Sequence, residues 1–220
     1  YSEHYILTLG NRDVGSLNEF MAKLPGDEKQ KLAQVREAYS YMMVHPGCKM
    51  MAPGTDMPEG LAKCIQALNT LYKSSPALYQ MDDEYDGFEW VQLMKYEENV
   101  ITFLRKTEKP EETLLVICNF AAIPYENYQV GVPFAGKYKE IFNSDAVEFG
   151  GEGVVNSRVK TAKAEECDER EHSIKVKLPA LGVSIYSCTP GKAPARKKVT
   201  AAKTAKDKTA KDKTAKDKTA

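Results

Sequence analysis

The sequence contains no long uninterrupted run of apolar residues, so none of its 220 residues is expected to form a membrane-spanning helix. Its five cysteines are odd in number, widely scattered and without a C-x-x-C pair, which argues against a disulfide framework and against a zinc site. This cysteine usage fits a reducing cytoplasm, where we expect the protein to reside. His4 and His172 have no set of ligands near them in the sequence, so we expect neither a metal nor a cofactor.

The net charge is zero, but the two signs are unevenly distributed along the chain. Residues 191–220 hold eleven Lys or Arg against three Asp, whereas the preceding 190 residues hold twenty basic and twenty-eight acidic groups. From Lys203 the sequence repeats Lys-Thr-Ala-Lys-Asp without a bulky apolar side chain, so residues 190–220 are predicted to be a disordered basic tail. Such a tail can bind an anionic polymer or maintain solubility, but nucleic acid is disfavoured because no aromatic side chain there can stack on bases.

The first 75 residues alternate between strand and helix patterns. An apolar strand at 5–9 leads into a loop rich in Gly, Asn and Asp, and the next helix starts at Pro25–Asp27 and ends at Pro46–Gly47. A short strand at 48–52 and a second helix, with apolar residues from Leu61 to Tyr72, follow. This order is typical of α/β folds with parallel strands, although two units cannot close a barrel.

From Phe88 onward the pattern changes to short β-branched or aromatic runs separated by turn residues. Seven such runs predict antiparallel strands and a β-sandwich over about residues 82–189, with a boundary near 75–87. The polar, glycine-rich stretch between the fifth and sixth runs, up to Glu171, is predicted to be a long surface loop. The fold class is therefore α+β, in two parts.

Two further side chains could belong to a site, and each also has a structural explanation. His45 follows a helix and precedes Pro46, which favours a helix C-terminal role over catalysis. Trp90 shares a strand face with Phe88 by the period of two, which favours core packing over stacking on a sugar.

Several stretches together resemble the C-terminal part of the 1,4-α-glucan (glycogen) branching enzymes of the α-amylase superfamily. They cover about residues 5–188 and include "KLPGDEKQKLAQVREAYSYMMVHPGCKMM", "ALNTLYKSSPALYQMDDEYDGFEWV", "NVITFLRK", "LLVICNFAAIPYENYQVGVPFAGKYKEIFNSDAVEFGGEG" and "HSIKVKLPALGVSIY". The resemblance implies that residues 1–75 are the last βα units of a (β/α)₈ catalytic barrel. It likewise implies that residues 76–189 are an all-β C-terminal domain, and it has no counterpart for the tail.

The resemblance also implies an activity. Members of this family cleave an α-1,4 linkage with retention and transfer the glucan segment to a 6-hydroxyl, which requires a nucleophilic carboxylate and an acid/base carboxyl group. In the family both groups lie on earlier barrel strands, upstream of anything in this chain. The expected partners are therefore an α-glucan and an upstream barrel half.

One family site should fall within the opening loop. The resemblance places a sugar-binding His-Asp pair at the end of the seventh barrel strand, where this chain has Gly10-Asn11-Arg12-Asp13. Asp13 is the candidate catalytic residue if the loop is shifted in register relative to the family, so that Asp13 takes the place of the family's carboxylate. Even then Arg12 replaces the histidine, and a permanent cation is no substitute for a neutral imidazole. The stretch after Met51 is also shorter than its family counterpart.

Two functions remain open from the sequence. The chain is either one piece of a working branching enzyme or a decayed paralogue, a non-catalytic module that binds α-glucan or another protein. In either case the chain alone is expected to be inactive, because neither essential carboxyl group lies at a recognisable position.

Overall fold

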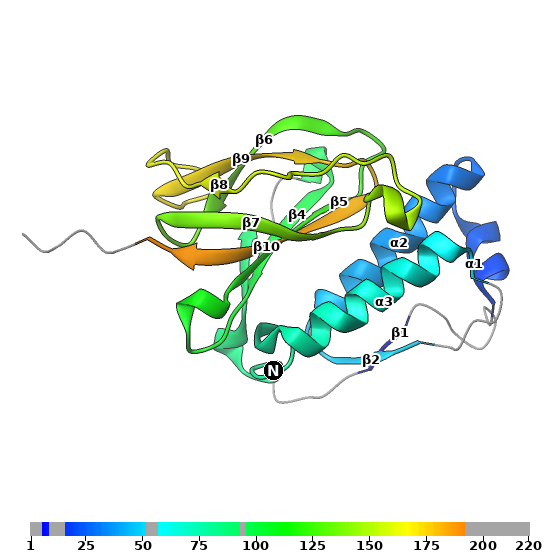
Figure 1. The fold of residues 1–220 in the computed structure, drawn as a ribbon, viewed down its shortest axis with the longest axis horizontal. Coiled ribbons are helices and arrows are strands. Elements are labelled where there is room, and N and C mark those ends of the chain that lie inside the picture. The colour runs from blue at the N-terminus through cyan, green and yellow to red at the C-terminus, as the bar shows by residue number, and fades with distance from the viewer. Residues whose placement is uncertain (1–5, 9–15, 52–56, 93–95, 192–220) are drawn as a thin grey trace, which may run out of the picture.

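The computed structural model describes residues 6–8, 16–51, 57–92 and 96–191. The first part of the chain contains two short strands and three helices (Figure 1): β1 (Ile6–Thr8), α1 (Leu17–Lys23), α2 (Glu28–Val44), β2 (Cys48–Met50) and α3 (Glu59–Ser74). Strands β1 and β2 pair in parallel, with Thr8 opposite Met50, as the alternation of strands and helices predicted. Within the described residues, no helix combines the length and the apolar character needed to cross a membrane.

Helix α2 forms where the sequence predicted it. Asp27 caps its first turn, since its carboxylate accepts the Gln30 N–H at 2.8 Å while the Gln30 side chain accepts the Asp27 N–H at 3.1 Å. The helix ends before Pro46, and its last residues, Met42 to Val44, are buried. The cap and the proline explain why both ends could be located from the sequence.

Helix α1 was not predicted. Ser16 caps it, because its hydroxyl accepts the Glu19 N–H at 3.2 Å and the Glu19 side chain accepts the Ser16 N–H at 3.1 Å. This Ser-x-x-Glu spacing is the sequence signal that was overlooked. The helix buries none of its residues, so no apolar periodicity indicated it.

The second part of the chain is an antiparallel β domain, and all seven predicted strands are present. They are β3 (Phe88–Gln92), β4 (Val100–Arg105), β5 (Leu114–Asn119), β6 (Tyr125–Val132), β7 (Gly136–Asn143), β9 (His172–Leu178) and β10 (Gly182–Pro190). The segment predicted as a surface loop contains an additional strand, β8 (Lys160–Thr161), which pairs with β7. The loop prediction was wrong there because two residues are too few to show an alternating pattern.

These strands form two sheets that pack face to face. One has the order β3-β4-β5-β10-β7-β8 and the other consists of β6 and β9. Their shared core includes Leu115 and Ile117 of β5, Val130 of β6, Val176 of β9 and Tyr186 of β10. Alternate residues of the large sheet point to opposite faces. One face packs against β6 and β9, so the apolar residues on the opposite face must be buried by another part of the chain.

Helices α2 and α3 provide that cover (Figure 1). A second core contains Met42 and Val44 of α2, Leu68 of α3, and Val116 and Ile185 of the large sheet. The protein is therefore built in three layers, and residues on both sides of position 75 share one core. The division into domains at that position stays a prediction.

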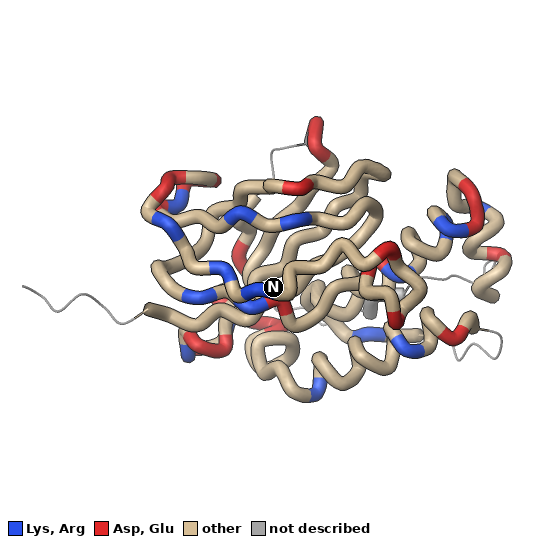
Figure 2. Tube along the Cα trace, turned by 45° about the horizontal axis from the view of Figure 1, so that its top comes forward, with Lys and Arg blue, Asp and Glu red and all other residues tan. Residues whose placement is uncertain are grey.

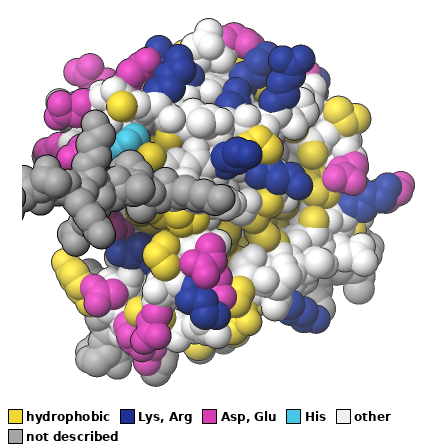
Figure 3. Space-filling view, turned by 60° about the vertical axis from the view of Figure 1, so that its left-hand side comes forward, with side chains coloured by type: hydrophobic (Ala, Val, Ile, Leu, Met, Phe, Trp, Pro, Cys, Tyr) yellow, Lys and Arg dark blue, Asp and Glu magenta, His cyan; other side chains and the backbone are white. Residues whose placement is uncertain are grey.

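Charged residues of both signs occur along the strands, loops and helices (Figure 2), and several basic side chains gather on the face seen in Figure 3. Two basic side chains of β9 are within ion-pair distance of acids, since Lys177 lies 2.9 Å from Glu126 and Lys175 lies 3.8 Å from Glu165. Exposed pairs of this kind contribute little to stability. The predicted basic tail, except for Pro190 and Gly191, lies outside the described residues.

Candidate functional site

The parallel pairing of β1 and β2 determines where the candidate site would be. Because Ile6 pairs with Cys48 and Thr8 with Met50, both strands end at the same edge of their small sheet. In barrels built from parallel strands, the loops that leave this edge carry the active site. The segments that follow, 9–15 and 52–56, lie outside the described residues, and with them Asp13, Arg12 and Gly10. The role of Asp13 stays a prediction.

At the opposite end of β2 lies a cluster of buried charged groups. Arg105 of β4 is fully buried and donates to the carbonyl oxygen of Val44 at 2.7 Å and to the Asp82 carboxylate. Asp82 also accepts the Gly47 N–H at 2.9 Å, and its carboxylate lies 3.9 Å from the Lys49 ammonium group. This charge-assisted network joins the end of α2, the start of β2 and the large sheet.

Lys49 is a base of this cluster with a strongly shifted pKa. Its ammonium group donates to the carbonyl oxygens of His45 and Gly47, and it lies 5.7 Å from the centre of the Tyr72 ring. Burial lowers the pKa of Lys49 to about 8, although the Asp82 carboxylate opposes that shift. The cluster is at the N-terminal end of β2, where barrel proteins carry structural rather than catalytic residues.

His45 belongs to this structural group, as predicted. It is the C-cap of α2, and its backbone N–H donates to the Tyr41 carbonyl oxygen at 2.9 Å. Its ring Nδ1 lies 3.0 Å from the Pro46 carbonyl oxygen, and burial lowers the pKa of His45. Burial thus favours the neutral imidazole, and the backbone of His45 closes the last turn of α2.

Trp90 lies at the border between core and surface. Its ring makes edge-on contacts with Phe88, at a centroid distance of 4.9 Å, and with Phe103 at 5.7 Å, but 38% of the residue is exposed. The predicted packing of Trp90 against Phe88 is therefore present, but part of Trp90 stays exposed to solvent. His172 lies on β9 opposite Val132, and His4 lies outside the described residues.

No group of three or more potential metal-ligating side chains occurs within the part of the chain that the structure describes. All five cysteines fall in this part, and no two of them form a disulfide. Burial raises the pKa of the Cys64 thiol to about 12, so this thiol is inert at neutral pH.

One buried acid of α2 has no signal in the sequence. Glu37 on α2 is 3% exposed, and its Oε1 atom has no hydrogen-bond partner among the described residues. Burial raises the pKa of Glu37 to about 9, so the side chain is protonated at neutral pH. It lies close enough to Cys118 of the large sheet for its charge to act on that thiol.

Comparison with known proteins identifies relatives of both parts of the chain. The family model "Alpha amylase, C-terminal all-beta domain" matches residues 90–189. A 1,4-alpha-glucan branching enzyme of Oceanobacillus iheyensis is 36% identical over 208 residues, covering 84% of this chain and 33% of that enzyme. One from Synechococcus elongatus is 33% identical over 214 residues, covering 87% of this chain and 28% of that enzyme. The chain therefore spans about a third of these relatives' length.

Among solved structures, a debranching enzyme of Nostoc punctiforme superposes with a TM-score of 0.51 at 14% sequence identity. The superposition covers 84% of this chain and 35% of that enzyme, so the likeness extends over helices as well as strands. At this identity the likeness concerns the fold alone. The sequence matches say more: the chain is a homologue of the 1,4-alpha-glucan branching enzymes over the third of their length that it spans, and its residues 90–189 match the α-amylase C-terminal all-β domain.

Proposed function

We propose that this chain is the C-terminal part of a 1,4-α-glucan branching enzyme, inactive alone, and that it completes a catalytic barrel supplied by an upstream half. The complete enzyme would transfer a glucan segment from an α-1,4 to an α-1,6 linkage with retention. That reaction requires a nucleophile and an acid/base about 5–5.5 Å apart. Both carboxyl groups would come from the upstream half, with α-glucan as the substrate.

The observation that supports this proposal best is the joint packing of the two parts of the chain. Strands β1 and β2 are parallel and are followed by helices, as the last two units of a (β/α)₈ barrel would be. Helices α2 and α3 share a core with the β domain, a cluster that includes Met42, Leu68 and Val116. The strands β1 and β2 with their helices could thus complete the barrel of an upstream half as an already folded unit.

The sequence of the opening loop supports a second candidate, a non-catalytic module that binds α-glucan or a protein. Gly10-Asn11-Arg12-Asp13 stands where the family resemblance places a His-Asp pair. Truncation alone would not alter such an internal motif. In this second reading the basic tail would contribute to binding an anionic partner, and its removal would abolish a salt-sensitive interaction.

Complementation separates the two candidates. Amylose stained with iodine is incubated with the purified chain, with an upstream branching-enzyme half, and with both together. We expect no branching by the chain alone and weak branching by the mixture. Asp13→Ala should abolish the mixture's activity if the loop has re-registered, whereas the matched exposed control Asp86→Ala should not.

Branching by the chain alone would contradict the proposal. A mixture without activity, despite binding between the two halves, would instead favour the non-catalytic module.

A further inference from the structure

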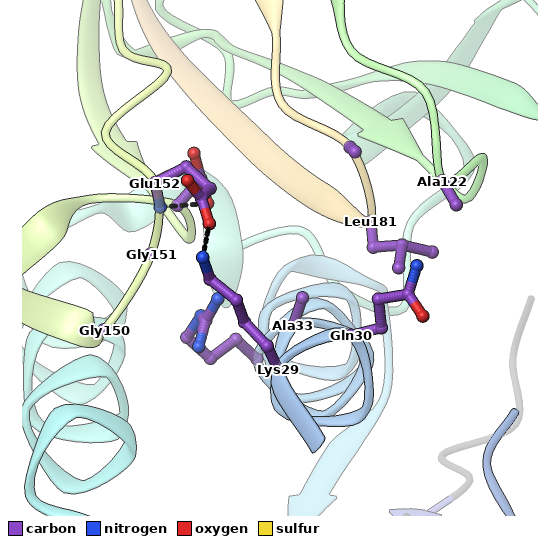
Figure 4. A pocket seen from close by; sticks show the side chains of 11 residues that line it. Lys29, Gln30, Ala33, Ala122, Gly150, Gly151, Glu152 and Leu181 are labelled. Atoms are coloured by element: carbon purple, nitrogen blue, oxygen red, sulfur yellow. Dashed lines mark hydrogen bonds and ion pairs between the residues drawn. The ribbon is translucent and has the colours of Figure 1, made fainter. Parts of the chain in front are cut away.

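The cover that helices α2 and α3 give the large sheet stops short of its β3 edge. Helix α3 packs on β7 and α2 packs on β10 and β5, while the sheet continues through β4 to β3. The side of α2 toward β7 is engaged, since Lys29 pairs with Glu152 of the loop that follows β7 (Figure 4) and Arg36 donates to the Ser144 carbonyl oxygen. The face of the sheet beyond α2, on β4 and β3, is thus left to another covering element.

Aromatic side chains line this remaining face. Trp90 of β3 pairs with Phe103 of β4, and Phe103 belongs to the core under the helices, so both rings lie on the helix side of the sheet. The centre of the Phe103 ring lies 5.7 Å from that of Trp90 and 6.3 Å from that of Tyr41 on α2. The Tyr41 ring in turn lies 6.0 Å from that of Phe120, just after β5.

This aromatic surface, made of Tyr41, Trp90 and Phe120, is incompletely buried. Trp90 is 38% exposed and Phe120 is 40% exposed, although each contacts another ring of the same group. Single exposed apolar side chains are common on protein surfaces, whereas contiguous ones mark a site of interaction. The surface therefore has the character of an interface that lacks its second half.

The adjoining side of α2 is also only partly covered. Gln34, Ala38 and Tyr41 are four and three positions apart, so they lie on one side of the helix. Each of them is half-buried, whereas Val35 and Val44 of the same helix are fully buried. Ala38 has a small side chain in the middle of this stripe, which allows another helix to approach α2 closely.

The order of the helices indicates which element covers the aromatic surface. In a (β/α)₈ barrel each strand is followed by a helix, and the helices form a ring around the strands in chain order. Helix α3 follows β2 and lies on β7, and α2 follows β1 and lies one step further, toward β5. The helix that precedes β1 would come next in the same direction, over β4 and β3. The aromatic surface lies in that position.

We propose that the aromatic surface binds the barrel helix that immediately precedes β1, supplied by the upstream half, through an apolar stripe on that helix. This inference rests on the proposed function and names the contact by which the upstream half is held. None of the three side chains carries a charge, so the stripe that covers them is apolar, as on an ordinary amphipathic helix. The β domain would then cover three consecutive barrel helices, two of its own chain and one of its partner.

Trp90 is the single tryptophan of the chain, so it can report directly on what covers it. The full 220-residue protein labelled with 5-fluorotryptophan should give one fluorine resonance, and an unlabelled upstream branching-enzyme half adds none. On titration with that half, we expect the resonance to shift until saturation. It should also lose its difference between H₂O and D₂O, because the indole leaves the solvent.

Two substitutions test the surface itself. Phe120→Asp places a charge in the apolar contact, and Ala38→Phe blocks the close approach to α2, so each should weaken association of the halves roughly tenfold or more. Val159→Asp is the matched control, because Val159 is 49% exposed and directly precedes β8, at the opposite edge of the same sheet. It should leave the affinity unchanged. Thermal melts confirm that each variant folds.

The outcomes separate this inference from the proposed function. Association with an unchanged Trp90 resonance, insensitive to Phe120→Asp and Ala38→Phe, would refute the inference alone. Shielding of Trp90 in a mixture that does not branch amylose would refute the proposed function alone, and absence of association would overturn both. If Trp90 is shielded in the concentrated chain by itself, with a dimer mass in sedimentation, a second copy rather than the upstream helix covers the surface, and the proposal is overturned.

Discussion

The guanidinium group of Arg105 donates a 2.7 Å hydrogen bond to the carbonyl oxygen of Val44, which joins strand β4 to the last turn of α2 across 61 positions of sequence. The same guanidinium group pairs with Asp82, and Asp82 accepts the Gly47 N–H. A helix C-terminus leaves carbonyl groups without partners inside the helix, and a cation is favourable there. Arg105 therefore ties the strand–helix part to the β domain.

Arg105→Met should destabilise the protein by about 3–5 kcal/mol, because it leaves Asp82 partly buried without its main partner. The measurement is urea unfolding at pH 7. Lys63→Met is the control, since Lys63 pairs with Glu59 on an exposed face of α3 and its loss should change little. Equal unfolding midpoints for the two variants would show that Arg105 does not join the two parts.

The lowered pKa of Lys49 predicts that the stability of the fold depends on pH in the alkaline range. Its pKa in the folded protein is about 8, below the ordinary value of 10.5, so the unfolded chain binds the proton more tightly. Between pH 8 and 10.5 the wild type should therefore gain stability relative to Lys49→Met, by up to about 3 kcal/mol. Denaturant unfolding of both proteins at several pH values measures this difference. A difference that stays constant over the window would contradict the lowered pKa.

The raised pKa of Glu37 predicts the opposite trend, a loss of stability as the pH rises from 4.5 toward 9. Its pKa in the folded protein is about 9, above the ordinary value of 4.5, so the folded state binds the proton more tightly. Glu37 therefore does not lower the free energy of unfolding below pH 4.5, where it is protonated in both states, and lowers it increasingly as the pH rises toward 9. Glu37→Gln, which is neutral and of the same shape, should be more stable than the wild type by about 1–3 kcal/mol at pH 7. The two proteins should converge near pH 4, and a less stable variant at pH 7 would refute the prediction.

The cap of α1 can be tested separately. Ser16→Ala removes the hydroxyl that accepts the Glu19 N–H, a change that costs about 0.5–2 kcal/mol at helix starts. Because α1 buries no side chain, the loss should be confined to that helix. Hydrogen exchange should accelerate within residues 17–23 while α2 keeps its protection. Faster exchange throughout α2 would show that α1 supports the core.

The sequence by itself predicted the elements whose signals are local. The Asp27 cap, the apolar spacing from Leu32 to Met42 and the following Pro46 located α2, and short β-branched runs located seven strands. Backbone propensity, capping and side-chain period act over a few residues, so they can be read without knowing the fold. The family resemblance, confirmed by the comparisons, also rested on the sequence alone.

Only the tertiary structure decided what those elements bury and which polar groups meet. Three features depend on long-range packing: α2 and α3 cover the large sheet, Arg36 reaches Ser144 across 108 positions, and Glu37 Oε1 is enclosed without a hydrogen-bond partner among the described residues. Strand β8 was missed because its signal is a pairing with β7 rather than a pattern of its own. Burial and electrostatics depend on neighbours that are distant in sequence, whereas periodicity reports only which face of an element is apolar.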